Sequence, residues 1–164
     1  MKSDNISRRS FFKQALALSA VSAMPAFWLP GAKAASGAPR VSANDKVRIA
    51  FIGIGNRGAD ISQRMFKTGL CEVVALCDVD MGAPHTQKII SMFPDVPRFQ
   101  DFRQMFDKMA DKIDAVTVCT PDHSHFPITI EAMAHGKHVY VEKPMARTFQ
   151  EVELMMRAEK KFGV

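Results

Sequence analysis

The chain has 164 residues, of which 47% are apolar and 24% charged, a composition that is typical of a globular domain and excludes an intrinsically disordered protein. The formal net charge is +5, but residues 1–34 hold five of the 22 basic residues and only one of the 17 acidic ones. The remainder carries 17 basic and 16 acidic residues and offers no excess of positive charge for binding a nucleic acid.

The first 34 residues are expected to be a signal peptide. A basic, polar start precedes an apolar stretch from Phe11 to Leu29, and Ala32-Lys33-Ala34 then fits a small-x-small cleavage site before Ala35. Residues 7–13, Ser-Arg-Arg-Ser-Phe-Phe-Lys, resemble the twin-arginine signal. Because the apolar stretch contains Ser and Pro, we expect no stable membrane span. The sequence thus predicts export to the periplasm or beyond by the twin-arginine machinery, with residues 35–46 as a linker.

From residue 47 onward, short apolar runs alternate with amphipathic segments that end at Gly or Pro. The runs predict strands at 47–52, 72–77, 97–99, 115–119 and 138–141. The segments predict helices at 57–68, 83–93, 102–110, 124–135 and 149–162, of which the third follows an N-cap at Asp101 and the last a capping box at 148–151. This alternation predicts an α/β fold, a Rossmann-like doubly wound parallel sheet that binds ligands at the carboxyl ends of its strands.

Residues 53–58, Gly-Ile-Gly-Asn-Arg-Gly, follow the first strand and open the first helix, which is the context that a dinucleotide-binding motif requires. The first glycine permits the tight turn, the second lets the backbone approach the diphosphate, and the third lets the helix pack closely on the strand. The helix N-terminus offers N–H groups and partial positive charge to the phosphates. The predicted cofactor contacts here are Gly53, Ile54, Gly55, Asn56, Arg57 and Gly58.

Asp78 follows the second strand, where a carboxylate accepts hydrogen bonds from the hydroxyls of the adenosine ribose. A 2′-phosphate would be repelled by Asp78 and Asp80, and residues 79–81 include no Arg or Lys to receive it. We therefore expect NAD as the cofactor in preference to NADP.

The cysteines and histidines predict no metal centre. Cys71, Cys77 and Cys119 lie in or at the start of apolar runs and are expected to be buried thiols. His123 and His125 form an H-x-H pair, but no third ligand with suitable spacing accompanies them.

Two further motifs follow the last two predicted strands: Thr-Pro-Asp-His-Ser-His at 120–125 and Gly-Lys-His-Val-Tyr-Val-Glu-Lys-Pro at 136–144. Together with the glycine motif and Asp78, they resemble the Gfo/Idh/MocA oxidoreductases over residues 46–164. The resemblance implies that Glu142 contacts the nicotinamide ribose and that Lys143 is catalytic, positioning the substrate hydroxyl and stabilising charge as the hydride leaves carbon. It also implies cofactor contacts from Thr120, Pro121, Asp122, His125 and Lys143.

The implied activity is NAD-dependent oxidation of a sugar or polyol by hydride transfer. Two alternatives stay open. One is an NAD-dependent glycosidase of the same superfamily, a branch that often carries Gly-x-Gly-Asn-Arg-Gly as here, although Lys143 favours the oxidoreductase. The other is a non-catalytic dinucleotide-binding module. Family members carry a second α/β domain that binds substrate, supplies the acid/base pair and mediates oligomerisation. Because the family pattern continues past Val164, we expect this chain to lack that domain and to be incomplete for catalysis, and the full-length protein to be a homo-oligomer.

Overall fold

The computed structural model describes residues 46–164. The predicted signal peptide (1–34) and all but the last residue of the predicted linker (35–46) lie outside the described residues. Within 46–164, no helix is both long and apolar enough to cross a bilayer.

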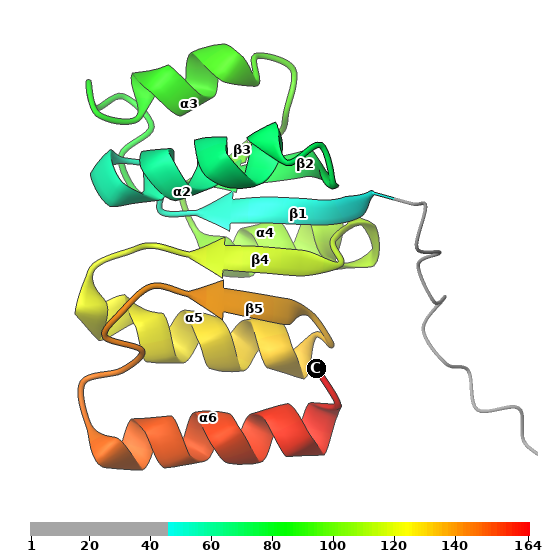
Figure 1. The fold of residues 1–164 in the computed structure, drawn as a ribbon, viewed down its shortest axis with the longest axis vertical. Helices are drawn as coiled ribbons and strands as arrows, with labels where there is room; N and C mark the ends of the chain where they lie inside the picture. Colours follow the sequence, from blue (N-terminus) through cyan, green and yellow to red (C-terminus); the bar gives the residue numbers. More distant parts are fainter. Residues whose placement is uncertain (1–45) are drawn as a thin grey trace, which may run out of the picture. The chain divides into compact units, whose positions relative to one another are not determined.

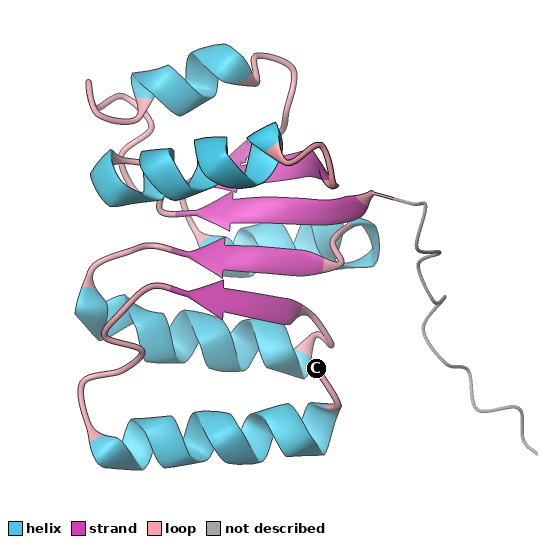
Figure 2. Cartoon of the chain, in the orientation of Figure 1, coloured by secondary structure: helices cyan, strands magenta, loops and turns pink. Residues whose placement is uncertain are grey.

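Five parallel strands form one sheet, and their arrows point the same way (Figures 1 and 2). They are β1 (Val47–Ile52), β2 (Cys71–Cys77), β3 (Arg98–Phe99), β4 (Ala115–Val118) and β5 (His138–Val141). Their order is β3-β2-β1-β4-β5, so the chain winds outward from β1 in one direction and then from β4 in the other. This confirms the predicted doubly wound fold, whose ligand position is the carboxyl edge between β1 and β4.

Helices lie on both faces of the sheet (Figure 1). They are α2 (Asn56–Lys67), α3 (Gln87–Met92), α4 (Phe102–Met109), α5 (Asp122–Ala134) and α6 (Phe149–Phe162), with a 3-10 turn at Ala110–Lys112. α2 and α3 lie on one face, α4 and α5 lie on the other, and α6 packs against α5. The predicted caps are confirmed: Asp101 accepts from the N–H of Arg103, and Thr148 and Glu151 form a complete capping box.

The core has two layers because alternate residues of each strand point to opposite faces. Ile49 and Phe51 of β1 pack beneath α2 and α3, while Ala50 and Ile52 pack beneath α4 and α5. β1 is therefore buried on both faces over its second half, which is why its sequence is an almost continuous apolar run.

One predicted helix is shorter than expected. The sequence predicted a helix over 83–93, but α3 begins only at Gln87. The preceding residues form turns instead, in which the buried Thr86 donates its hydroxyl to the carbonyl of Ala83 at 2.8 Å. Such side-chain-to-backbone bonds compete with helical ones, so the apolar spacing in this segment overstated the helix.

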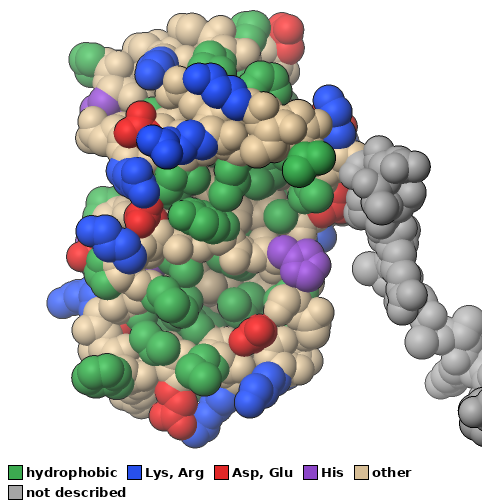
Figure 3. All heavy atoms as spheres, viewed as in Figure 1, with side chains coloured by type: hydrophobic (Ala, Val, Ile, Leu, Met, Phe, Trp, Pro, Cys, Tyr) green, Lys and Arg blue, Asp and Glu red, His purple; other side chains and the backbone are tan. Residues whose placement is uncertain are grey.

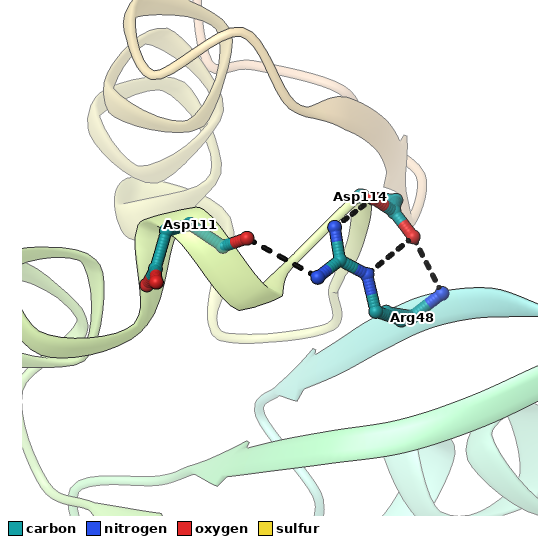
Figure 4. Close-up of polar contacts among 3 residues, drawn as sticks. All are labelled: Arg48, Asp111 and Asp114. Carbon is teal, nitrogen blue, oxygen red and sulfur yellow. Dashed lines mark hydrogen bonds and ion pairs between the residues drawn. The ribbon is translucent and has the colours of Figure 1, made fainter. Parts of the chain in front are cut away.

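At the amino ends of the strands, an ion pair joins β1 to the start of β4 (Figure 4). Arg48 Nη2 lies 2.6 Å from Asp114 Oδ1, and Arg48 Nε and its backbone N–H both donate to Asp114 Oδ2. The Arg48 side chain also donates to the carbonyl of Asp111. These bonds lie at the edge of the sheet opposite the glycine motif.

Hydrophobic side chains are exposed in a hollow between α2 and α6, over the face of the sheet that bears α2 (Figure 3). On β5, Val139 and Val141 pack into the core beneath α4 and α5, so Tyr140 points to the other face, where it is 45% exposed.

Candidate functional site

The turn from β1 into α2 is closed so tightly that two of its positions admit only glycine. Gly53 has φ of +78°, and its N–H donates to the carbonyl of Cys77 at 2.8 Å. A β-carbon on Gly58 would overlap the carbonyl oxygen of Gly53. Gly55 is the N-cap and has no side chain that could cap the helix, and the first turn of α2 contains no acidic residue. The N-terminus of α2 therefore suits an anion.

Asp78, at the end of β2, holds this turn in place. Its Oδ2 accepts from the backbone N–H of Ile54 at 2.9 Å, and its Oδ1 accepts from the N–H of Asp80 at 3.0 Å. A carboxylate has about four acceptor positions, so roughly two remain for donors such as ribose hydroxyls. Asp78 is thus fixed beside the glycine turn by hydrogen bonds to both of its carboxylate oxygens.

A cavity of about 830 Å³ runs along the carboxyl edge of the sheet and is within the range of ligand pockets. Seven of the predicted cofactor contacts line it: Gly53, Gly55, Asn56, Arg57, Asp78, Thr120 and Pro121. The other predicted contacts are not part of its wall, namely Ile54, Gly58, Asp122, His125, Glu142 and Lys143. The walls of the cavity come from the loops after four of the five strands, as the winding of the sheet requires.

Arg57 connects the glycine turn to the segment that follows β5. Its Nε donates to Glu142 Oε2 at 2.8 Å, and Glu142 Oε1 accepts from the backbone N–H of Lys143 at 3.0 Å. The bond from the Lys143 N–H and the guanidinium of Arg57 together lower the pKa of Glu142, so this side chain is a carboxylate at neutral pH. Lys143 itself is exposed.

His125 connects the loops after β4 and β5 from inside the protein. It is 1% exposed, and its Nε2 and Nδ1 lie 2.7 Å from the carbonyl oxygens of Thr120 and Pro144 respectively. Both neighbours are acceptors and a neutral imidazole carries one ring N–H, so the ring donates to one of the two carbonyls at a time while it lies against both loops. The structure therefore places His125 behind the cavity wall, where it positions residues that lie closer to the cavity.

The lining residues that the sequence analysis did not predict as contacts include His85, Gln100, Phe102 and Arg103. The guanidinium of Arg103 lies 4.4 Å from the centre of the Phe102 ring, and Gln100 donates to the carbonyl of Val79 at 3.1 Å. The segment 100–103 could have been found, because it follows β3 and the carboxyl ends of parallel strands share one edge. Nothing in the sequence pattern pointed to His85, whose position depends on the turns before α3.

In residues 46–164, we also considered a reactive thiol and a metal site. Burial raises the pKa of Cys77 to about 12 and that of Cys119 to about 11, so both thiols are protonated and unreactive at neutral pH. In residues 46–164, no three His, Cys, Asp or Glu side chains are arranged to hold a metal ion.

The donor set fits a dinucleotide. The N-terminus of α2 can receive a diphosphate, the fixed carboxylate of Asp78 can receive ribose hydroxyls, and one continuous cavity contains both. The turn that would hold the diphosphate requires glycine at positions 53 and 58, because a β-carbon at either position would overlap neighbouring backbone atoms.

Residues 47–164 match the family described as "Oxidoreductase family, NAD-binding Rossmann fold", Gfo/Idh/MocA. An alpha-N-acetylgalactosaminidase of Bacteroides fragilis is 37% identical over 121 residues, which cover 70% of this chain and 28% of that protein. A glycosyl hydrolase family 109 protein of Shewanella baltica is 35% identical over 167 residues, which cover 90% of this chain and 35% of that protein. The chain thus spans about a third of the length of these curated relatives.

Solved structures of similar fold include dehydrogenases. One, from Chromobacterium violaceum, has a TM-score of 0.67 and 25% sequence identity, with 73% of this chain and 34% of that chain covered. The WlbA dehydrogenase of the same organism, solved in complex with NADH and UDP-GlcNAcA, has a TM-score of 0.64 and 24% identity, with 74% and 34% covered.

Proposed function

The chain belongs to the Gfo/Idh/MocA oxidoreductase family and is its NAD-binding domain, and from that premise we propose that it serves an enzyme which transfers a hydride from a sugar or polyol to NAD. The observation that carries the proposal is the bond between the Asp78 carboxylate and the N–H of Ile54, which fixes the ribose-binding group beside the diphosphate-binding turn.

Each part of the cavity has a proposed task in holding the dinucleotide. The N-terminus of α2 binds the diphosphate, and Asp78 binds the adenosine ribose. Asp78 and Asp80 together disfavour a 2′-phosphate, which supports NAD over NADP, although Arg103 lines the same cavity. When bound, NAD supplies the acceptor for a hydride.

The residues after β5 have proposed roles toward the reacting groups. Glu142 is held as a carboxylate and is proposed to bind the nicotinamide ribose, while Lys143 is proposed to position the substrate hydroxyl and to stabilise negative charge on it. An exposed lysine is suited to this role because its ammonium is a compact donor on a flexible stem. The family resemblance implies that Lys143 would work with an acid/base pair from a second domain.

A second candidate is an NAD-dependent glycosidase, and sequence identity favours it. The relatives named as alpha-N-acetylgalactosaminidase or family 109 proteins are 29–37% identical to this chain, whereas the two dehydrogenases of similar fold described above are 24–25% identical. Both activities would begin with the same hydride transfer, so the residues of this domain serve either one. A module that binds NAD without catalysis is the third candidate.

Export by the twin-arginine route is also part of the proposal and rests on residues 7–13. That route carries folded proteins, so the enzyme would acquire NAD in the cytoplasm and retain it tightly after export.

Two measurements test these proposals. Absorbance and mass spectrometry of the purified protein should detect NAD that is already bound or that binds when it is added. A protein with no affinity for NAD would overturn the main proposal. Incubation of the full-length protein with aryl glycosides separates the two enzymes. Release of the aglycone without net NADH establishes the glycosidase, whereas NADH formation from a free sugar or polyol establishes the oxidoreductase.

A further inference from the structure

The side chain of His85 lies directly over Gly55, the residue that caps α2. A β-carbon on Gly55 would overlap Cδ2 of His85 and lie 3.0 Å from its Nε2. His85 is itself exposed and lines the same cavity as Gly55 and Asp78. The ring thus stands over the N-terminus of α2, although 30 residues separate it from Gly55 in the sequence.

The loop that carries His85 is held by its own hydrogen bonds. Thr86 is 0% exposed and donates its hydroxyl to the carbonyl of Ala83 at 2.8 Å. Gln87 donates to the carbonyl of Met81 at 2.9 Å, and Asp80 accepts from the N–H of Gly82 at 3.2 Å. Because these bonds lie on both sides of His85, the loop presents its ring to the glycine turn without help from a ligand.

We propose that His85 binds the dinucleotide's diphosphate, donating a ring N–H to a phosphate oxygen opposite the backbone N–H groups of α2. This inference rests on the proposed function, because it assumes that NAD occupies the cavity. Phosphate is favoured as the acceptor because the ring lies over the α-carbon of the residue that begins the helix, and an anion binds at that end of a helix. The glycine turn and His85 then form two walls of one phosphate site.

The opposite possibility is that the ring obstructs the diphosphate. The two cases predict opposite signs for removal of the ring. As a donor, His85 contributes to affinity, and its loss weakens binding. As an obstruction, its loss strengthens binding. A comparison of ADP, which carries a diphosphate, with adenosine, which does not, then shows whether His85 contacts the diphosphate or the nucleoside.

The test measures the affinity of the full 164-residue chain for NAD, ADP and adenosine by calorimetry or NMR titration. We expect His85→Ala to weaken NAD and ADP binding about tenfold, the value of one hydrogen bond to a charged group, and to leave adenosine binding unchanged. His85→Asn, which retains an N–H donor, should recover part of the loss. His138→Ala, at an exposed histidine that begins β5 at the other edge of the sheet, should bind like the wild type.

Unchanged or tighter NAD binding by His85→Ala would overturn the proposal, as would an equal loss for adenosine. A wild-type chain that binds neither NAD nor ADP would overturn the proposed function as well. In the wild-type chain, the His85 ring signals should also shift on addition of ADP but not of adenosine. This second measurement decides the question even if a variant fails to fold, because ring signals that ignore ADP contradict the contact.

Discussion

Arg57 of the glycine turn and Glu142 of the segment after β5 are 85 residues apart in the sequence and form an ion pair with an Nε–Oε2 distance of 2.8 Å. The pair joins the two ends of the predicted motif set, the diphosphate-binding turn and the Glu-Lys-Pro segment. The Arg57 side chain is 59% exposed and that of Glu142 only 12%, so the arginine reaches over the glutamate from the solvent side. The position of Lys143 therefore depends on a contact made by the first helix of the domain.

The first prediction follows from this pair. Arg57→Met and Glu142→Gln should each weaken NAD binding by roughly three- to tenfold, because the released segment must be ordered again when the cofactor binds. The double variant should be no weaker than the poorer single variant, since both changes break the same contact. Calorimetric titration of the four proteins measures this cycle, and strictly additive losses would mean that the two residues act on NAD independently.

Asp78 should control both affinity and cofactor choice. Asp78→Ala removes a charged acceptor and should weaken NAD binding roughly ten- to hundredfold. NADP binding should fall less, because the same change removes a negative charge that repels the 2′-phosphate. Asp78→Asn, which keeps an oxygen for the N–H of Ile54, should preserve the fold of the turn. Dissociation constants for both cofactors test this, with the exposed Asp95 changed to Ala as the control; an unchanged NAD constant would remove Asp78 from the site.

Gly58 should not tolerate any side chain. Gly58→Ala places a β-carbon against the backbone carbonyl of Gly53, which cannot move without opening the turn, so we expect a loss of roughly 2–3 kcal/mol in the free energy of unfolding. Gly82→Ala is the matched control, because a β-carbon there would meet only Asp80 Oδ1 at 3.6 Å. Urea unfolding should therefore find Gly58→Ala less stable than Gly82→Ala. Equal stability of the two variants would show that the turn can relax.

His125 should contribute to stability through the two carbonyl groups that it joins. His125→Phe fills a similar volume but donates no hydrogen bond to Thr120 or Pro144, so the free energy of unfolding should fall by about 2 kcal/mol. His138→Phe, at an exposed position, should have little effect. Chemical unfolding measures both, and a fully stable His125→Phe protein would mean that water satisfies these carbonyls.

The Arg48–Asp114 pair should make stability depend on pH in acid. The hydrogen bond from Arg48 lowers the pKa of Asp114 below its ordinary value of 3.8, so the stabilisation is complete above that pH and is lost as the pH falls through the lowered pKa. Asp114→Asn should cost about 1 kcal/mol at neutral pH, because the partly exposed pair is screened by solvent. Unfolding free energies from pH 7 down to about pH 2 should converge for the two proteins. Parallel curves would exclude Asp114 as the titrating group.

The sequence predicted the local elements well wherever a single periodicity governed them. The apolar run of β1 ends at Ile52 as predicted, because a strand buried on both faces needs apolar residues throughout and Gly53 ends it. The start of α6 was equally clear, because the Thr148–Glu151 capping box is a short-range hydrogen-bond pattern. α3 was less predictable, since the bonds of Thr86 replaced part of the expected helix with turns.

The sequence by itself determined the fold class, the glycine turn and the acid at the end of β2, because these depend on strand and helix periods and on one fixed spacing. Only the tertiary structure decided that Asp78 holds the turn at Ile54, that Arg57 pairs with Glu142, and that the buried His125 joins two loops. The position of His85 over Gly55 was likewise decided only by the tertiary structure. These contacts join segments that meet because a parallel sheet gathers the carboxyl ends of its strands at one edge, and no local pattern encodes which side chains will touch there.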